Sequence, residues 1–266
     1  MAQGVGRRLR RFNPRIFKMI LFKKSVFFVA LLGAVLCWSA DDPKPYVEGD
    51  ALPNALKFYP PPPDTNSAAF AYDMAQYKWG KSVRVADTAR ANLAIAQAVT
   101  DDAEMAKMFS EPFGMEISEK NTPAIMNVLK RGIFTMRLAS RVAKKHYMRV
   151  RPYARLKEPT LIPSAEESHL NNGSYPSGHT VRGWGMALLL AEINPAAQDA
   201  LLKYGYEWGQ SRVIAGYHWQ SDIEASKAVV TAVFARLHAE EAFLADMKKA
   251  RDEFKRLSAK QKKKTK

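Results

Sequence analysis

Three short segments of this 266-residue chain combine cations, histidines and tight turns, which are the groups that bind anions and move protons. The first segment places Arg151 seven residues after Lys144, so both cations would share one face of a continuing helix. Pro152 disfavours helical backbone at Arg151, so we expect Arg151 to leave the helix end and point into a cleft. Taken alone, these cations are also typical of an ordinary helix C-terminus, where they offset its negative end.

The second segment reads Gly-Ser-Tyr-Pro-Ser-Gly-His-Thr from Gly173 to Thr180 and leads directly into a helical pattern. A turn that begins a helix presents unpaired backbone N–H groups to an anion. Ser177 adds a hydroxyl donor, Gly178 allows close approach, and His179 adds a proton that titrates near neutral pH. A helix cap with an incidental histidine would explain this segment equally well by itself.

The third segment runs from Ser211 to Asp222 and contains Arg212 and His218. His218 and Asp222 are four residues apart, so on a helix the carboxylate would reach the imidazole. Asp222 could then hold the Nδ1 proton and leave Nε2 as an unprotonated nucleophile. Alone, such a pair on a helix is more often structural than catalytic.

The elements that must position these segments are predicted to be helices. Apolar residues recur at three- and four-residue steps through residues 125–139, as one buried helix face requires. Similar patterns continue to about residue 237, and neither alternating strands nor Asn-Gly hairpin turns are evident. The breaks between helices are expected at Asn194-Pro195 and Ala215-Gly216. We therefore predict an all-α fold, a single helical domain of about eight helices.

The N-terminus has the features of a secretory signal peptide over residues 1–40. Residues 1–24 carry eight basic side chains and no acid, an apolar stretch follows at 25–36, and small residues end at Ala40. A retained anchor is the alternative, although the apolar stretch is short of the roughly 20 residues that span a bilayer. Met19 would begin a more ordinary signal than Met1. We predict export to the periplasm and no membrane contact after cleavage.

Composition sets the remaining boundaries. Residues 41–65 are polar and proline-rich and predict an extended arm, residues 66–257 form the helical domain, and residues 258–266 are a basic disordered tail. The net charge of +15 belongs to the ends, because residues 41–247 hold 23 basic and 24 acidic groups. This distribution disfavours nucleic acid as a partner. The single cysteine excludes a disulfide framework and a cysteine zinc site.

In chain order, Lys-x6-Arg-Pro, Pro-Ser-Gly-His and Ser-Arg-x5-His-x3-Asp resemble the three-part signature of the phosphatidic-acid-phosphatase type 2 superfamily. The longer strings at 173–180 and 209–222 are similar to the class A bacterial nonspecific acid phosphatases, over about residues 58–257. Ala215 departs from the family, because many relatives carry a disulfide-forming cysteine there. The resemblance implies an all-helical acid phosphatase that hydrolyses many phosphomonoesters without a metal or other cofactor and forms a homodimer.

The resemblance also implies a role for each matching residue. His218 corresponds to the nucleophile that takes the phosphoryl group, Asp222 to its orienting partner, and His179 to the general acid and later base. The phosphate cradle corresponds to Lys144, Arg151, Ser177, Gly178 and Arg212. The sequence has no cluster of carboxylates that would suggest a metal site. We expect His146, His169 and His238 to be noncatalytic.

Three other functions remain open at this point. Vanadium haloperoxidases share the signature and bind vanadate where phosphate would lie, but their chains are generally much longer. Lipid phosphatases of the same superfamily carry several membrane spans. A basic protein that binds nucleic acid or anionic lipid through its tail is an alternative of another class.

Overall fold

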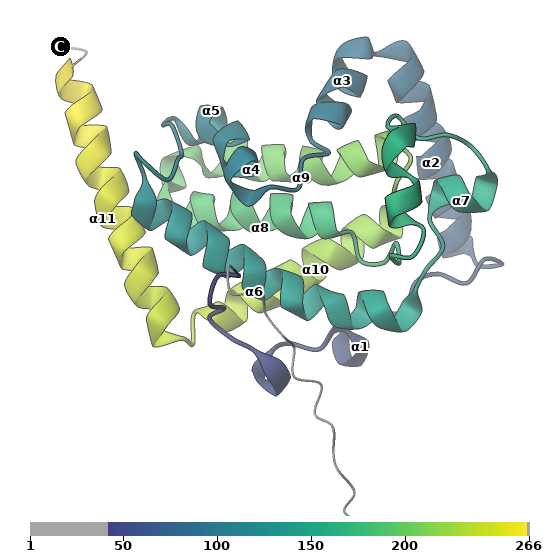
Figure 1. Ribbon diagram of the computed structural model, residues 1–266, viewed down its shortest axis with the longest axis horizontal. Helices are drawn as coiled ribbons and strands as arrows, with labels where there is room; N and C mark the ends of the chain where they lie inside the picture. The colour runs from purple at the N-terminus through teal and green to yellow at the C-terminus, as the bar shows by residue number, and fades with distance from the viewer. Residues whose placement is uncertain (1–41, 265–266) are drawn as a thin grey trace, which may run out of the picture. The chain divides into compact units, whose positions relative to one another are not determined.

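The computed structural model describes residues 42–264, and this part of the chain is helical and has no β-strand (Figure 1). The α-helices are α1 (Ala55–Phe58), α2 (Ala68–Ala86), α3 (Thr88–Ala96), α4 (Asp102–Met108), α5 (Ser110–Phe113), α6 (Pro123–Tyr147), α7 (Pro152–Leu156), α8 (Gly178–Ile193), α9 (Gln198–Ile214), α10 (Gln220–Leu237) and α11 (Glu241–Lys264). Short 3-10 helices lie at Gly49–Ala51, Pro163–Ala165, Glu167–His169 and Pro195–Ala197. The predicted all-α class is confirmed. Three of the α-helices have only four or five residues, too few to show a periodic pattern, which is why the sequence indicated about eight.

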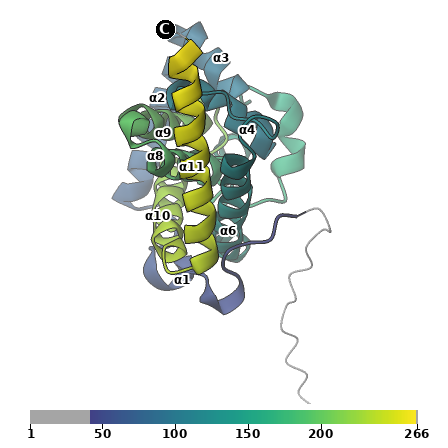
Figure 2. The ribbon, with the colours of Figure 1, turned by 90° about the vertical axis from the view of Figure 1, so that its left-hand side faces the viewer.

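The core forms around α6 and α8. The apolar positions of α6 predicted to share a face, among them Ile125, Leu129 and Ile133, are fully buried. Helix α8 packs against α6, α9 and α10, and α11 lies beside α6 (Figure 2). None of the helices in the described part of the chain is both long and apolar enough to cross a membrane.

Two glycines let α8 and α9 approach closely. A Cβ atom at Gly183 would lie 2.6 Å from the ring of Trp208, and one at Gly205 would lie 2.5 Å from the Cβ of Ala187. Both distances are shorter than side-chain contacts allow, so each position requires glycine. Because Gly183 faces Trp208 and Gly205 faces Ala187, the two helices are antiparallel, and the first turn of α8 lies opposite the last turn of α9.

Both predicted helix breaks are confirmed. Helix α8 ends at Ile193, directly before Asn194-Pro195, and α9 ends at Ile214. Gly216 follows with φ of +84°, a left-handed conformation that glycine adopts without a steric penalty, and the chain turns there toward α10.

Two predicted boundaries are wrong. The segment 41–65 is not a plain extended arm, because it contains α1 and buries Tyr46, whose N–H donates to Thr135 Oγ1 at 3.0 Å. The tail does not begin at residue 258, because α11 continues to Lys264. The predicted signal peptide, residues 1–40, lies outside the described residues.

Candidate active site

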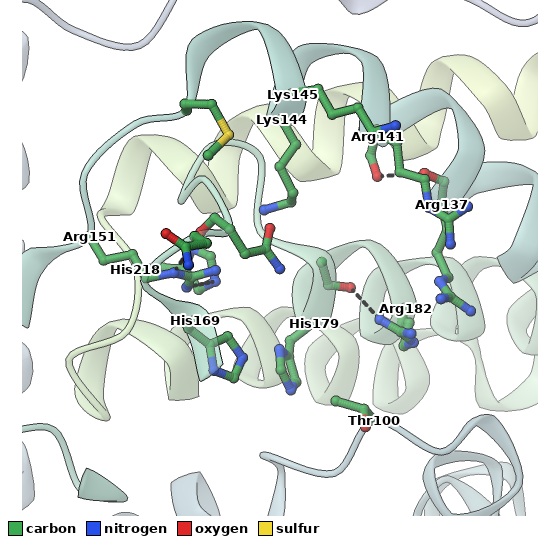
Figure 3. A pocket seen from close by; sticks show the side chains of 15 residues that line it. Thr100, Arg137, Arg141, Lys144, Lys145, Arg151, His169, His179, Arg182 and His218 are labelled. Carbon is green, nitrogen blue, oxygen red and sulfur yellow. Dashed lines mark hydrogen bonds between the residues drawn. The ribbon is translucent and has the colours of Figure 1, made fainter. Parts of the chain in front are cut away.

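A pocket of about 560 Å³ opens between the C-terminal half of α6 and the first turns of α8 (Figure 3). Five of the eight predicted site residues line it: Lys144, Arg151, Gly178, His179 and His218. The other three, Ser177, Arg212 and Asp222, are buried beside them. The three sequence segments therefore meet at one place in the fold.

The first segment reaches the pocket by a reversal at the end of α6. The helix ends at Tyr147, so the continuous helix on which Lys144 and Arg151 would share a face is not formed. Arg151 is extended and precedes the first residue of α7, as the proline predicted. Its guanidinium donates to the carbonyls of Asn172 and Tyr217, at 3.1 and 3.2 Å, while Lys144 Nζ donates to the Gly173 carbonyl at 2.6 Å.

The second segment forms the N-terminal cap of α8. Ser177 is the cap residue, and its Oγ accepts from the Thr180 N–H at 3.3 Å. The N–H groups of Gly178 and His179 belong to the first turn and have no acceptor within the helix. They are available to an anion at the positive end of the helix dipole.

The third segment brings His218 to Asp222 in a different way from the one expected. His218 lies before α10 rather than on it, and Asp222 is in the first turn of that helix. Asp222 Oδ2 accepts from the Trp219 N–H at 2.9 Å and lies 3.2 Å from His218 Nδ1. The pair thus forms across a helix start, where the carboxylate also caps the helix.

The contacts of His218 determine its tautomer. Arg151 Nη1 lies 3.0 Å from His218 Nε2, and a guanidinium can only donate hydrogen bonds. Nε2 therefore accepts, and the ring proton is on Nδ1, facing Asp222. The imidazole is neutral, with its Nε2 lone pair directed toward the cations.

Burial and nearby cations favour the neutral form of both pocket histidines. Burial holds the pKa of His218 well below its usual value, and Arg151, Lys144 and Arg212 lower it further. Burial likewise lowers the pKa of His179, with Arg212 contributing, while a hydrogen bond between His179 Nε2 and the Ala98 carbonyl at 2.9 Å opposes the decrease. The neutral form of His218 agrees with the tautomer that its hydrogen-bond partners indicate.

Arg212 is a buried cation that lacks a counter-charge among the described residues. Its side chain is 2% exposed, and its Nε and Nη1 atoms have no hydrogen-bond partner there. The guanidinium packs over the ring of Tyr217 at 4.6 Å, and burial lowers its pKa to about 10. Buried cations are ordinarily paired, so this one indicates a site for an anion.

A buried ion-pair network behind His218 was not predicted from the sequence. Arg149 Nη1 donates to Asp222 Oδ1 at 2.6 Å, and Arg149 Nη2 donates to Asp73 Oδ2 at 2.7 Å. Asp73 also accepts from the N–H and hydroxyl of Ser221, at 2.8 and 2.6 Å, and Ser174 Oγ donates to Asp222 Oδ2. The network holds both oxygens of the Asp222 carboxylate. The sequence does contain a signal for this network, because the acidic residue Asp73 lies between the apolar residues Phe70 and Tyr77 on the buried face of α2.

The remaining histidines lie in different surroundings. His169 lines the pocket, and its Nδ1 is 2.7 Å from the Ala165 carbonyl. His146 is exposed, and His238, which pairs with Glu192 at 3.0 Å, lies at the C-terminal end of α10, whereas the pocket lies at its N-terminal end. That all three are noncatalytic stays a prediction. Within residues 42–264, no three histidine, cysteine or carboxylate side chains are grouped as metal ligands.

Comparison with known proteins agrees with this arrangement. The family model of the PAP2 superfamily matches residues 126–240, which include all eight predicted site residues. A non-specific acid phosphatase of Providencia stuartii is 43% identical over 213 residues, which cover 80% of this chain and 85% of that protein. A non-specific acid phosphatase of Salmonella typhimurium is 38% identical over 230 residues, covering 86% and 90%, and an acid phosphatase of Zymomonas mobilis is 32% identical over 198 residues, covering 74% of each. With its all-helical fold and its three converging motifs, the chain belongs to the PAP2 superfamily and, within it, to the bacterial non-specific acid phosphatases.

Proposed function

We propose that this acid phosphatase hydrolyses a broad range of phosphomonoesters through a phosphohistidine at His218 and needs no metal ion. The observation that carries the proposal is the tautomer of His218. Arg151 fixes Nε2 as the unprotonated nitrogen at 3.0 Å, and Asp222 accepts from the opposite side of the ring. A neutral imidazole with its lone pair facing a cluster of cations is suited to attack phosphorus.

In the first step, the Nε2 lone pair of His218 forms a bond to phosphorus as the bond to the ester oxygen breaks. The negative charge of the bound phosphate offsets the burial and the cations that lower the pKa of His179, and protonated His179 gives its proton to that oxygen, so the alcohol leaves neutral. In the second step, neutral His179 takes a proton from water, the water oxygen attacks phosphorus, and the N–P bond breaks. Inorganic phosphate leaves, and both histidines return to their starting protonation states.

The phosphate cradle is the set Lys144, Arg151, Arg212, Ser177 and the Gly178 N–H. Three cations and two uncharged donors can offset the charge on the non-bridging oxygens, which is the contribution that metal ions make in other phosphoryl-transfer enzymes. Every contact in this set is with the phosphoryl group rather than with the alcohol. We therefore expect many phosphomonoesters to be accepted.

The phosphohistidine is tested by trapping it. In His179→Asn the nucleophile remains, and p-nitrophenyl phosphate has a leaving group that needs little protonation, so the first step proceeds. Hydrolysis of the intermediate should slow by about 10²- to 10⁴-fold without the base. Acid-labile, base-stable phosphate should then accumulate on His218 and be absent in His218→Ala. Phosphate found on His179 in His218→Ala would reverse the assignment of the two histidines.

Metal independence is tested in the same assay. We expect turnover of p-nitrophenyl phosphate to be unchanged by EDTA, with an acidic optimum set by the need for protonated His179. Loss of activity in EDTA that a divalent cation restores would refute this part of the proposal. Bromide oxidation in the presence of vanadate, measured in parallel, would identify a haloperoxidase instead.

The proposal extends to location and assembly. Residues 1–40 have the pattern of a secretory signal, so we propose export to the periplasm, to be tested by cell fractionation. We also propose a homodimer. In its support, α2 exposes the large apolar side chains Tyr72, Trp79 and Val85. Light scattering of the purified protein measures the assembly, and a mass of one chain would refute the dimer.

A further inference from the structure

The end of the pocket away from His218 carries positive charge that the proposed phosphate cradle does not use. Besides Lys144 and Arg151, four basic residues line the pocket: Arg137, Arg141, Lys145 and Arg182. No carboxylate is among the pocket-lining residues of the described chain. Figure 3 shows Arg137, Arg141 and Arg182 grouped on one side of the pocket and His218 and Arg151 on the other. We call Arg137, Arg141, Lys145 and Arg182 the distal cluster.

Helix geometry places the three arginines of the distal cluster one to two turns from the cradle along the helix axes, whereas Lys145 directly follows Lys144. On α6, Arg141 precedes Lys144 by three residues and Arg137 precedes it by seven, which correspond to about 4.5 and 10 Å along the helix axis. On α8, the backbone of Arg182 follows Gly178 by four residues, or about 6 Å, and its Nη1 reaches back to 3.5 Å from the Gly178 carbonyl. The helices are antiparallel, because Gly132 faces Leu189 and Gly185 faces Met136. The three arginines are therefore displaced from the cradle in the same direction along the two helices.

The distal cluster has more cations than nearby carboxylates. Asp102 lies 3.1 Å from Arg182 Nε and 3.9 Å from Arg137 Nη1, and Asp42 also attracts Arg137. Arg141 contacts the ring of Phe134 at 5.9 Å and makes no ion pair within residues 42–264. Lys145, which is exposed, also makes none there.

The distal cluster brings like charges close together. Burial and, to a smaller extent, the neighbouring Arg182 lower the pKa of Arg137 to about 10, so its charged form is less favourable there than in water. Arg137 and Arg141 are four residues apart on α6, a spacing at which like charges destabilise a helix. A bound anion would offset both effects.

We propose that the distal cluster is a second anion site, and that it binds a second phosphate group of the substrate while the first lies in the cradle. The preferred substrates would be phosphomonoesters whose two phosphates are separated by about 5 to 10 Å, the axial distance along α6 from Lys144 to Arg141 and Arg137. This inference rests on the proposed function, because it takes the cradle as the place of the reacting phosphate. It adds a substrate class that the cradle alone does not select.

The test measures binding without turnover. Isothermal titration calorimetry of the full protein would compare methylphosphonate with alkane bisphosphonates of increasing chain length. We expect one intermediate length to bind at least about tenfold more tightly than methylphosphonate, as one additional charge-assisted contact implies. Equal affinities along the series would overturn the second site. A phosphonate of the same length that ends in a carboxylate should bind less tightly, and equal binding would overturn the assignment to phosphate.

Arg141→Gln is the main variant, because Arg141 has no ion pair whose loss would leave a carboxylate unpaired. It should remove most of the bisphosphonate advantage and leave methylphosphonate affinity within about twofold. Lys145→Gln is a second variant at an exposed position, and Lys203→Gln on α9 is the matched control outside the pocket. If Arg141→Gln reduced the affinity for methylphosphonate and for the bisphosphonate equally, Arg141 would contribute only to the general positive potential of the pocket. That result would refute the second anion site. Absence of p-nitrophenyl phosphate turnover by the unaltered protein would instead refute the proposed function, and the binding series would still decide the distal site.

Discussion

Lys144 is the cradle residue whose charge the structure makes most sensitive to pH. Burial and, to a smaller extent, the neighbouring Arg151 lower its pKa to about 7, against an opposing contribution from Asp222. Lysine is a cation only when protonated, so its charge is present below pH 7 and is lost as the pH rises through that value. Affinity for a doubly charged anion should therefore be greatest in acid and fall above neutrality.

The size of this effect has two limits. With a pKa of about 7, the protonated fraction of Lys144 falls roughly 90-fold between pH 6 and pH 9. A hydrogen bond from a charged donor contributes about 1.5–3 kcal/mol, equivalent to roughly 10- to 150-fold in affinity. We therefore expect the dissociation constant for sulfate, which remains a dianion over this range, to rise by about 10- to 90-fold. Burial and nearby cations lower the pKa values of both pocket histidines, so their titration is displaced toward acid, away from that of Lys144.

Calorimetric titration with sulfate at several pH values, for three variants beside the unaltered protein, measures the effect. Lys144→Arg keeps its charge throughout, so its affinity should be nearly constant between pH 6 and pH 9. Lys144→Met should bind weakly at every pH, and Lys203→Met should follow the unaltered protein. A constant affinity for the unaltered protein, or the same decrease in Lys144→Arg, would refute the assignment of this titration to Lys144.

Three further predictions concern the cradle, the network behind it and the helix packing that positions both. Arg212→Ala should reduce kcat/KM for p-nitrophenyl phosphate by about 10²- to 10³-fold, the usual loss of one preorganised donor, while Lys203→Ala should change it less than about twofold. Equal losses would show that only net charge matters. Arg149→Met leaves Asp222 and Asp73 as unpaired buried carboxylates, so thermal denaturation should show a loss of about 3–5 kcal/mol. Its kcat should fall more than its KM rises, because Arg149 contacts the orienting carboxylate rather than the phosphate. Unchanged stability would contradict the network. Gly183→Ala, forced against the ring of Trp208, should cost about 1–3 kcal/mol in unfolding free energy with the activity of the folded fraction unchanged, and a wild-type melting temperature would contradict the close packing.

The sequence was sufficient where the physical signal is local. Helical periodicity over residues 125–139 predicted the buried face of α6, and the punctuating residues Asn194-Pro195 and Ala215-Gly216 predicted where α8 and α9 end. Pro152 predicted that Arg151 would be extended. Each of these signals depends on backbone preference or side-chain spacing within a few residues. The order of the three motifs then identified the residues that converge on the pocket. The four-residue spacing of His218 and Asp222 predicted that both lie on one helix, but α10 begins at Gln220, after His218.

Tertiary structure decided what no local pattern encodes. Asp73 and Arg149 are 76 residues apart in the sequence, yet they form one buried ion pair that holds Asp222. The second set of pocket cations likewise depends on the antiparallel packing of α6 and α8. Charged side chains in helices usually lie on a solvated face, so sequence spacing gives no reason to expect them in a pocket. Their pairing, burial and lowered pKa values arise only when distant helices exclude water from the same space, because electrostatic interactions depend on three-dimensional distance and burial rather than on position along the chain.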